Sequence, residues 1–114
     1  MSSNLALLNE EPFEKIEAGT KTVELRLYDE KRQLLKVNDY IEFTNPDGKR
    51  KLTVLIEDLQ VYKSFAELYK SCDKASMGYA EEDTADPDDM KKYYSDEMQK
   101  KYGVIAIKIK RIKE

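Results

Sequence analysis

Hydrophobic and polar residues alternate along several short stretches of this 114-residue chain. Successive side chains of a strand point to opposite faces of a sheet, so this alternation predicts strands with one buried face. The expected strands cover residues 4–8, 21–28, 50–62 and 104–112, and one more strand begins at Tyr40.

Turn signals separate these stretches. The sequence Asn45-Pro46-Asp47-Gly48 is the strongest of them and predicts a hairpin between the strand from Tyr40 and the long strand after it. Glu57-Asp58 marks an expected bend in the long strand, a feature typical of small barrels.

Capping residues predict three short helices. Asn9 offers an N-cap to the first helix, and Gly19 supplies the positive-φ residue that ends it. Ser64, with Glu67 three residues later, fits a capping box at the start of the second helix. Ser95 begins the third helix in the same way. These helices are placed between the strands, which indicates an α+β fold.

Six carboxylates fall within residues 81–89. Helix capping explains most of them, because Asp86 can cap a fourth short helix that starts at Pro87, and the two following aspartates complement its dipole. Glu81 and Glu82 are not explained in this way. They therefore stay open as candidates for a site.

Charged side chains gather on one face of the strand expected over residues 21–28. Glu24 and Arg26 form either part of a cleft or a solvated surface ion pair worth about 0 to 1 kcal/mol. Lys31 and Arg32, just beyond the strand, form either a solvated loop or a positive rim beside the site. The apolar face carries Val23, Leu25 and Leu27, and the polar face carries Thr22, Glu24, Arg26 and Tyr28.

The spacing Gly-x-Lys-x-x-Glu-x-Arg, here Gly19, Lys21, Glu24 and Arg26, resembles the signature of ASCH domains in the PUA-like superfamily. The chain is similar to a small single-domain bacterial-type member. The resemblance implies an α+β fold over one domain, residues 1–114. It would be a PUA-like small β-barrel of about six mostly antiparallel strands with three or four short helices. Further matching segments are Phe13-x-x-Ile16-x-x-Gly19, residues 37–41, Tyr93-Tyr94-Ser95 and Tyr102-Gly103-Val104. Members of this family commonly have Gly-Asp where this chain has Asn38-Asp39, so the resemblance implies a left-handed backbone at Asn38, which asparagine tolerates better than other non-glycine residues.

Composition narrows the chemistry. The absence of histidine excludes His-based triads and acid–base catalysis by histidine. With Cys72 as the one cysteine, it also excludes zinc sites that need more than one soft or imidazole ligand, and we expect no metal and no cofactor. A net charge of -3 argues against coating nucleic acid by bulk electrostatics. No apolar run approaches the roughly 18 residues of a membrane span and no secretory signal is recognised, so we expect a cytoplasmic protein without membrane contact.

Two functions from different classes fit these residues. In the first, the chain binds RNA or a nucleotide or nucleoside, as the resemblance to ASCH domains implies. Lys21 and Arg26 would meet phosphate, and Tyr28 or Tyr79 would stack on a base. The oligomeric state is left open. The full set of expected ligand-binding residues is Lys21, Thr22, Glu24, Arg26, Tyr28 and Tyr79.

The second function is hydrolysis, again implied by resemblance. Some small bacterial ASCH proteins similar to this chain are N4-acetylcytidine amidohydrolases, in which the motif lysine works with a threonine three residues later and a more distant glutamate. Lys21 matches the lysine, but Glu24 stands where the threonine is expected. The distant glutamate would be Glu81 or Glu82.

A modified mechanism is chemically consistent with the residues present. Glu24 would activate water while Lys21 or Arg26 stabilises an oxyanion, which makes Lys21 and Glu24 the candidate catalytic pair. Thr22 is a possible substitute hydroxyl. A third interpretation is purely structural, in which the three charged groups only close the floor of a cleft.

Overall fold

The computed structural model describes residues 3–112. Within this range five strands form one sheet, and no helix is both long and apolar enough to cross a bilayer. The strands are β1 (Ser3–Leu7), β2 (Val23–Leu27), β3 (Tyr40–Thr44), β4 (Lys51–Tyr62) and β5 (Val104–Arg111). The helices are α1 (Glu10–Ala18), α2 (Phe65–Ser71) and α3 (Asp96–Tyr102), with short 3-10 helices η1 (Arg32–Leu34) and η2 (Pro87–Lys92).

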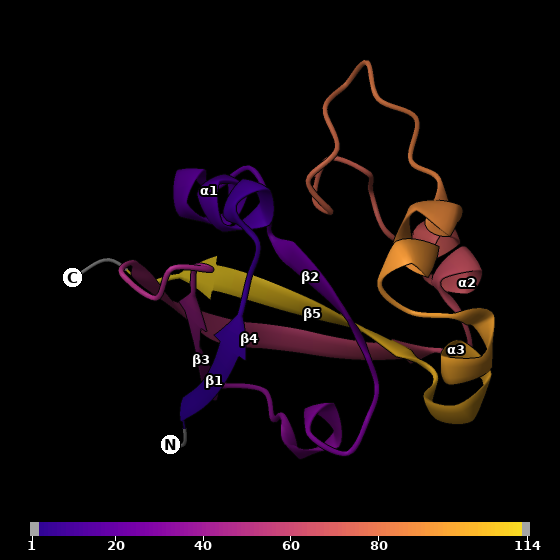
Figure 1. Ribbon diagram of the computed structural model, residues 1–114, viewed down its shortest axis with the longest axis horizontal. Coiled ribbons are helices and arrows are strands. Elements are labelled where there is room, and N and C mark those ends of the chain that lie inside the picture. The colour runs from indigo at the N-terminus through magenta and orange to yellow at the C-terminus, as the bar shows by residue number, and fades with distance from the viewer. Residues whose placement is uncertain (1–2, 113–114) are drawn as a thin grey trace.

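The sheet is mixed and curls into a half-barrel with the strand order β1-β3-β4-β5-β2 (Figure 1). β1 pairs with β3 in parallel, and the other three pairings are antiparallel. The expected PUA-like α+β fold with mostly antiparallel pairing is therefore confirmed, with five strands among residues 3–112 where about six were expected. β1 and β2 are the two edges of this sheet.

Several local predictions are confirmed. Asn38 has a φ of 76°, and the amide of Gly48 donates to the Asn45 carbonyl at 3.0 Å in the hairpin turn. The register of β4 against β5 shifts between Ile56 and Asp58, which is the expected bend. These features bring β3, β4 and β5 into one curved surface.

The core consists of two hydrophobic clusters on opposite faces of the sheet. The first cluster lies under α1, where Phe13 and Ile16 pack on β3, β4 and β5. The second lies under α2, where Phe65 and Leu68 pack on β2 and β5. Figure 1 shows α1 near one end of the sheet and α2 and α3 grouped at the other. The first half of β5 is buried on both faces, because the strand contributes Ile105, Ile107 and Ile109 to the first cluster and Val104 and Ala106 to the second.

The register of β2 decides where its charged side chains lie. Glu24 pairs with Ile107 and Arg26 with Ile105, and directly paired residues share a face of the sheet. Both charged groups therefore point toward the first cluster. Leu25 and Leu27 point to the second cluster. The interpretation of Glu24 and Arg26 as a solvated surface pair is wrong, because both faces of β2 are covered.

Candidate functional site

A cleft with a volume of 770 Å³ opens over the charged face of β2. The segment that joins β1 to α1 and the first turns of α1 form one wall. The chain between α2 and α3, which includes η2, forms the opposite wall. The floor is β2 and the residues just before it. Segments distant in sequence therefore meet around one space.

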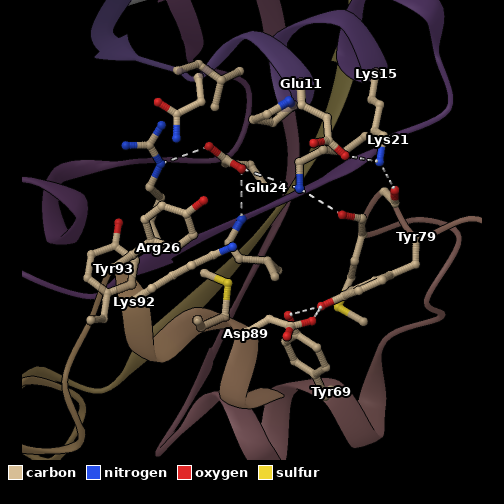
Figure 2. A pocket seen from close by; sticks show the side chains of 18 of the residues that line it. Glu11, Lys15, Lys21, Glu24, Arg26, Tyr69, Tyr79, Asp89, Lys92 and Tyr93 are labelled. Atoms are coloured by element: carbon tan, nitrogen blue, oxygen red, sulfur yellow. Dashed lines mark hydrogen bonds and ion pairs between the residues drawn. The ribbon is translucent and has the colours of Figure 1, made fainter. Parts of the chain in front are cut away.

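Glu24 lies at the floor of this cleft between two cations (Figure 2). Its Oε2 accepts a hydrogen bond from Arg26 Nε at 2.8 Å, and its Oε1 lies 3.5 Å from Lys21 Nζ. The exposed fractions of Glu24 and Lys21 are 5% and 7%. Two cations face one carboxylate, so this charge cluster of Lys21, Glu24 and Arg26 carries a net positive charge.

The position of Lys21 follows from how α1 ends. Gly19 adopts a φ of 84°, which reverses the chain after Ala18, and the amide of Lys21 then donates to the Lys15 carbonyl at 3.1 Å. β2 begins only at Val23, two residues later than expected. Strand alternation therefore does not fix the direction of Lys21, and its side chain reaches the same side as Glu24.

Two lysines hold the wall opposite α1. Lys21 Nζ donates to the Met77 carbonyl at 2.9 Å, and Lys15 Nζ donates to the Gly78 carbonyl at 2.7 Å. These are consecutive carbonyls of the segment after α2. Lys15 also pairs with Glu11 one helical turn earlier, at 3.0 Å. The wall that follows α2 is thus fastened to α1 and to the floor by side-chain hydrogen bonds.

Burial and mutual attraction oppose each other in the charge cluster. Burial lowers the pKa of Lys21, although the Glu24 carboxylate counteracts it. Burial alone would raise the pKa of Glu24, but Lys21 and Arg26 outweigh it and hold that pKa below its usual range. Burial alone would lower the pKa of Arg26, but its interactions with Glu24 and Tyr94 together outweigh burial and raise that pKa. Glu24 therefore stays ionised at neutral pH and is a weak base.

Arg26 also connects the two edges of the sheet. Its Nη2 donates to the carbonyl of Leu7 at the end of β1, at 2.8 Å. β1 and β2 do not pair with each other within the described sheet. A side chain therefore bridges the gap that backbone hydrogen bonds leave open in the half-barrel.

Tyrosines line the wall opposite α1. The Tyr79 hydroxyl donates to Asp89 Oδ2 at 2.9 Å and lies 2.9 Å from the Tyr69 hydroxyl (Figure 2). One hydroxyl has one proton, so Tyr69 supplies the proton of the bond between the two tyrosines. Burial and these two neighbours raise the pKa of Tyr79. Tyr69, Tyr79 and Asp89, here called the tyrosine wall, therefore present phenols that stay protonated at neutral pH.

The cleft contains four of the expected ligand-binding residues, namely Lys21, Glu24, Arg26 and Tyr79. The other two lie outside its lining. Thr22 is exposed, and Tyr28 packs against the first hydrophobic cluster.

The other sequence candidates also lie outside the cleft. Glu81 and Glu82 are exposed and do not line it. Asp86 instead caps η2 as expected, since its side chain accepts from the Asp88 amide at 2.9 Å. Lys31 and Arg32 line a separate small cavity that also includes Arg26.

Sequence reasoning missed much of the wall opposite α1. The helix expected after Ser64 gives Tyr69 no role in a site, and Asp89 is expected only to complement a helix dipole, but both residues line the cleft. Tyr93 and Tyr94 line it as well, and Tyr93 is 55% exposed. The one available signal was the Tyr93-Tyr94-Ser95 segment in the family resemblance. That segment indicated the family without indicating a role.

The cluster is better suited to holding a ligand than to activating water. Both oxygens of Glu24 are engaged by cations, and a carboxylate with a lowered pKa accepts protons poorly. Thr22 does not line the cleft. Among residues 3–112, no group of three or more Cys, Asp or Glu side chains is arranged to hold a metal ion.

Comparisons with known proteins place the chain in a family. The model of the ASCH domain matches residues 7–113. The crystal structure of hypothetical protein PH0355 is similar, with 35% identity, a TM-score of 0.82, and coverage of 97% of this chain and 100% of that one. The NMR structure of protein PF0455 from Pyrococcus furiosus has 31% identity, a TM-score of 0.69, and coverage of 99% and 100%.

A more distant structure agrees in fold alone. The S128A mutant of ZmASCH from Zymomonas mobilis has 15% identity and a TM-score of 0.67, and the match covers 95% of this chain and 67% of that one. A search of curated proteins gave no significant match. The family signature found in the sequence, Gly19, Lys21, Glu24 and Arg26, forms the end of α1 and the floor of the cleft. The chain therefore belongs to the ASCH domain family.

Proposed function

We propose that the cleft binds one nucleotide or nucleoside unit, either free or at an unpaired position of an RNA. One observation carries this proposal: a 770 Å³ space has a floor with net positive charge and a wall of tyrosines. This volume lies in the range of pockets that take small ligands, about 300 to 1,000 Å³. Aromatic rings are the usual stacking surface for unpaired bases.

The charges around the cleft favour the binding of a single nucleotide unit rather than of a long stretch of RNA. The cationic floor is offset by Asp83 and Asp89 on the wall opposite α1, and the whole chain has a net charge of -3. A protein that follows an RNA backbone needs an extended basic surface. Here the positive charge is local and buried, which suits one or two phosphate groups.

Binding is tested by titrating the 15N-labelled protein with the four ribonucleosides and their monophosphates. We expect chemical-shift changes at Gly78, Tyr79 and Tyr93 for at least one of them. Tyr93→Ala should weaken binding about tenfold, because a stacked base is worth about 1 to 3 kcal/mol. Met98→Ala removes another exposed apolar side chain, on α3, and should bind like the wild type. If no nucleoside or nucleotide shifts these resonances at millimolar concentration, the proposal is wrong.

The same samples test hydrolysis. N4-acetylcytidine should remain intact, because Glu24 is a weak base and no hydroxyl stands at the motif position three residues after Lys21. Release of cytidine that Lys21→Met abolishes in a folded protein would replace the binding proposal with an amidohydrolase.

A further inference from the structure

A second, smaller cavity lies beside the cleft. Its volume is 30 Å³, and Glu24 and Arg26 line both spaces. Lys31 and Arg32, from the connection between β2 and β3, line only the small cavity. Arg26 therefore stands between a large cleft and a small basic cavity.

The small cavity has the room and the charge for a small anionic group. A volume of 30 Å³ exceeds the roughly 10 to 15 Å³ that one water requires, but it is far too small for a base. Three cationic residues, Arg26, Lys31 and Arg32, contribute to its lining. Apart from Asn4 and Glu24, the remaining lining residues are apolar, namely Leu5, Ala6, Leu35, Ile41, Phe43 and Ile107. The carboxylates beside them are Glu24 and Asp29, the latter 3.3 Å from Arg32 Nη1. The cavity thus carries a net positive charge.

Donors remain for a ligand. The guanidinium of Arg26 has five N–H groups, and its interactions with Glu24, Leu7 and Tyr94 engage three of them, which leaves two for a ligand. Lys31 is exposed and takes part in no ion pair found among residues 3–112. A guanidinium and an ammonium that face one small space are typical phosphate-binding groups.

Charge is distributed unequally over the two neighbouring spaces, which share Glu24 and Arg26 as lining residues. The small cavity and the adjacent floor are cationic, whereas on the far wall of the cleft the two carboxylates Asp83 and Asp89 outnumber the one cation, Lys92, beside the tyrosines. A phosphate is repelled by the carboxylates at that far wall. A base can stack there and donate its amino or imino hydrogens to Asp89. The distribution therefore favours one orientation of a ligand.

We propose that Arg26, Lys31 and Arg32 form a phosphate subsite and that the ligand is a phosphorylated nucleotide with its base toward the tyrosine wall. The inference rests on the proposed function and makes it more specific, since it selects phosphorylated nucleotides over nucleosides. It also assigns Lys31 and Arg32 as residues that determine this preference.

The test compares each ribonucleoside with its 5′- and 3′-monophosphates by calorimetry. The wild type should bind at least one monophosphate ten times more tightly than its nucleoside. The variant Lys31→Gln/Arg32→Gln should lose this preference and keep its affinity for the nucleoside. The control Lys49→Gln/Lys100→Gln removes the same charge at exposed positions outside both cavities and should keep the preference.

Each alternative outcome is informative. Equal wild-type affinity for nucleoside and monophosphate overturns the subsite and leaves the proposed function standing. A preference that survives in Lys31→Gln/Arg32→Gln shows that other residues hold the phosphate. If neither ligand class binds, the proposed function fails, and titration with inorganic phosphate decides the subsite. Phosphate should then shift the amide resonances of residues 31 and 32, and an absence of shifts overturns the subsite too.

Discussion

The side chain of Lys21 packs directly against Gly78. A Cβ added at Gly78 would lie 3.3 Å from Lys21 Cδ, and Gly78 has a φ of +102°. The lysine reaches Met77, the residue before this glycine, with its ammonium group. The absence of a side chain at position 78 therefore allows the floor of the cleft and the wall opposite α1 to meet closely.

Gly78→Ala should destabilise the protein by about 2 kcal/mol, because the new side chain adds both backbone strain and a tight contact. Gly48→Ala is the matched control. Its φ is +75°, but a Cβ there would meet nothing within 4 Å, so only the backbone term of about 1 kcal/mol applies. Urea unfolding of both variants measures the difference. Equal losses would show that the contact with Lys21 is easily relieved.

Arg26→Gln should be strongly destabilising, by about 3 to 5 kcal/mol, because it leaves Glu24 buried with only one cationic partner. Arg26→Lys keeps the charge but lacks the planar guanidinium that bonds Glu24 and Leu7 at the same time. We therefore expect it to lower the unfolding free energy by an intermediate amount. Arg50→Gln breaks an exposed ion pair with Glu17 and should change the unfolding free energy little. The three free energies are compared by denaturant unfolding. A loss for Arg26→Gln no larger than for Arg50→Gln would contradict the burial of the cluster.

Glu24 should make the free energy of unfolding depend on pH in the acidic range. Its pKa in the folded protein lies below the ordinary value of 4.5, so below about pH 4.5 the unfolded chain binds the proton more readily. The stabilisation from Glu24 is complete above that pH and is lost as the pH falls through the folded pKa. Other carboxylates add to acid unfolding, so the informative quantity is the difference in unfolding free energy between the wild type and Glu24→Gln.

That difference should be largest near neutral pH and should shrink as the pH falls toward 3. Glu57→Gln, which changes an exposed carboxylate outside the cluster, should give a curve parallel to that of the wild type. A gap between wild type and Glu24→Gln that stays constant from pH 7 to pH 3 would contradict the lowered pKa of Glu24.

Salt should weaken RNA binding only moderately. If one or two phosphates contact the protein, the logarithm of the affinity of a six-nucleotide single strand should fall with the logarithm of salt concentration with a slope of about -0.7 to -1.4. Fluorescence anisotropy titrations at salt concentrations from about 50 to about 300 mM give this slope. A slope near -4 would indicate an extended RNA path and would contradict the single-unit cleft.

Sequence patterns predicted the elements well because their causes are local. The Asn45 to Gly48 turn, the left-handed Asn38 and the cap at Ser64, which accepts from the Glu67 amide, each depend on a few adjacent residues. Asn9 is the N-cap residue of α1, but its side chain makes no capping hydrogen bond. Position was thus predictable even where the expected bond was not formed.

The site was predictable only as far as one motif reached. Lys21, Glu24 and Arg26 lie within six residues, and their spacing identified the floor of the cleft. Tyr69 and Asp89 are 20 residues apart and meet through the fold of the chain after α2, which no local pattern encodes. The burial of both faces of β2 could not be predicted from the sequence either, since it depends on the register of β2 with β5 and on two separate hydrophobic clusters.

The hydrogen bond from Arg26 to Leu7 links the two edges of the sheet. The guanidinium of Arg26 fastens the curved sheet at its open side and also lines the cleft. A molecule that binds the Arg26 guanidinium would strengthen or weaken its hydrogen bond to Leu7. Occupancy of the cleft should therefore change how readily β1 and β2, the two edges of the sheet, separate. If the cleft binds a nucleotide as proposed, ligand recognition and the closure of the sheet depend on the same side chain.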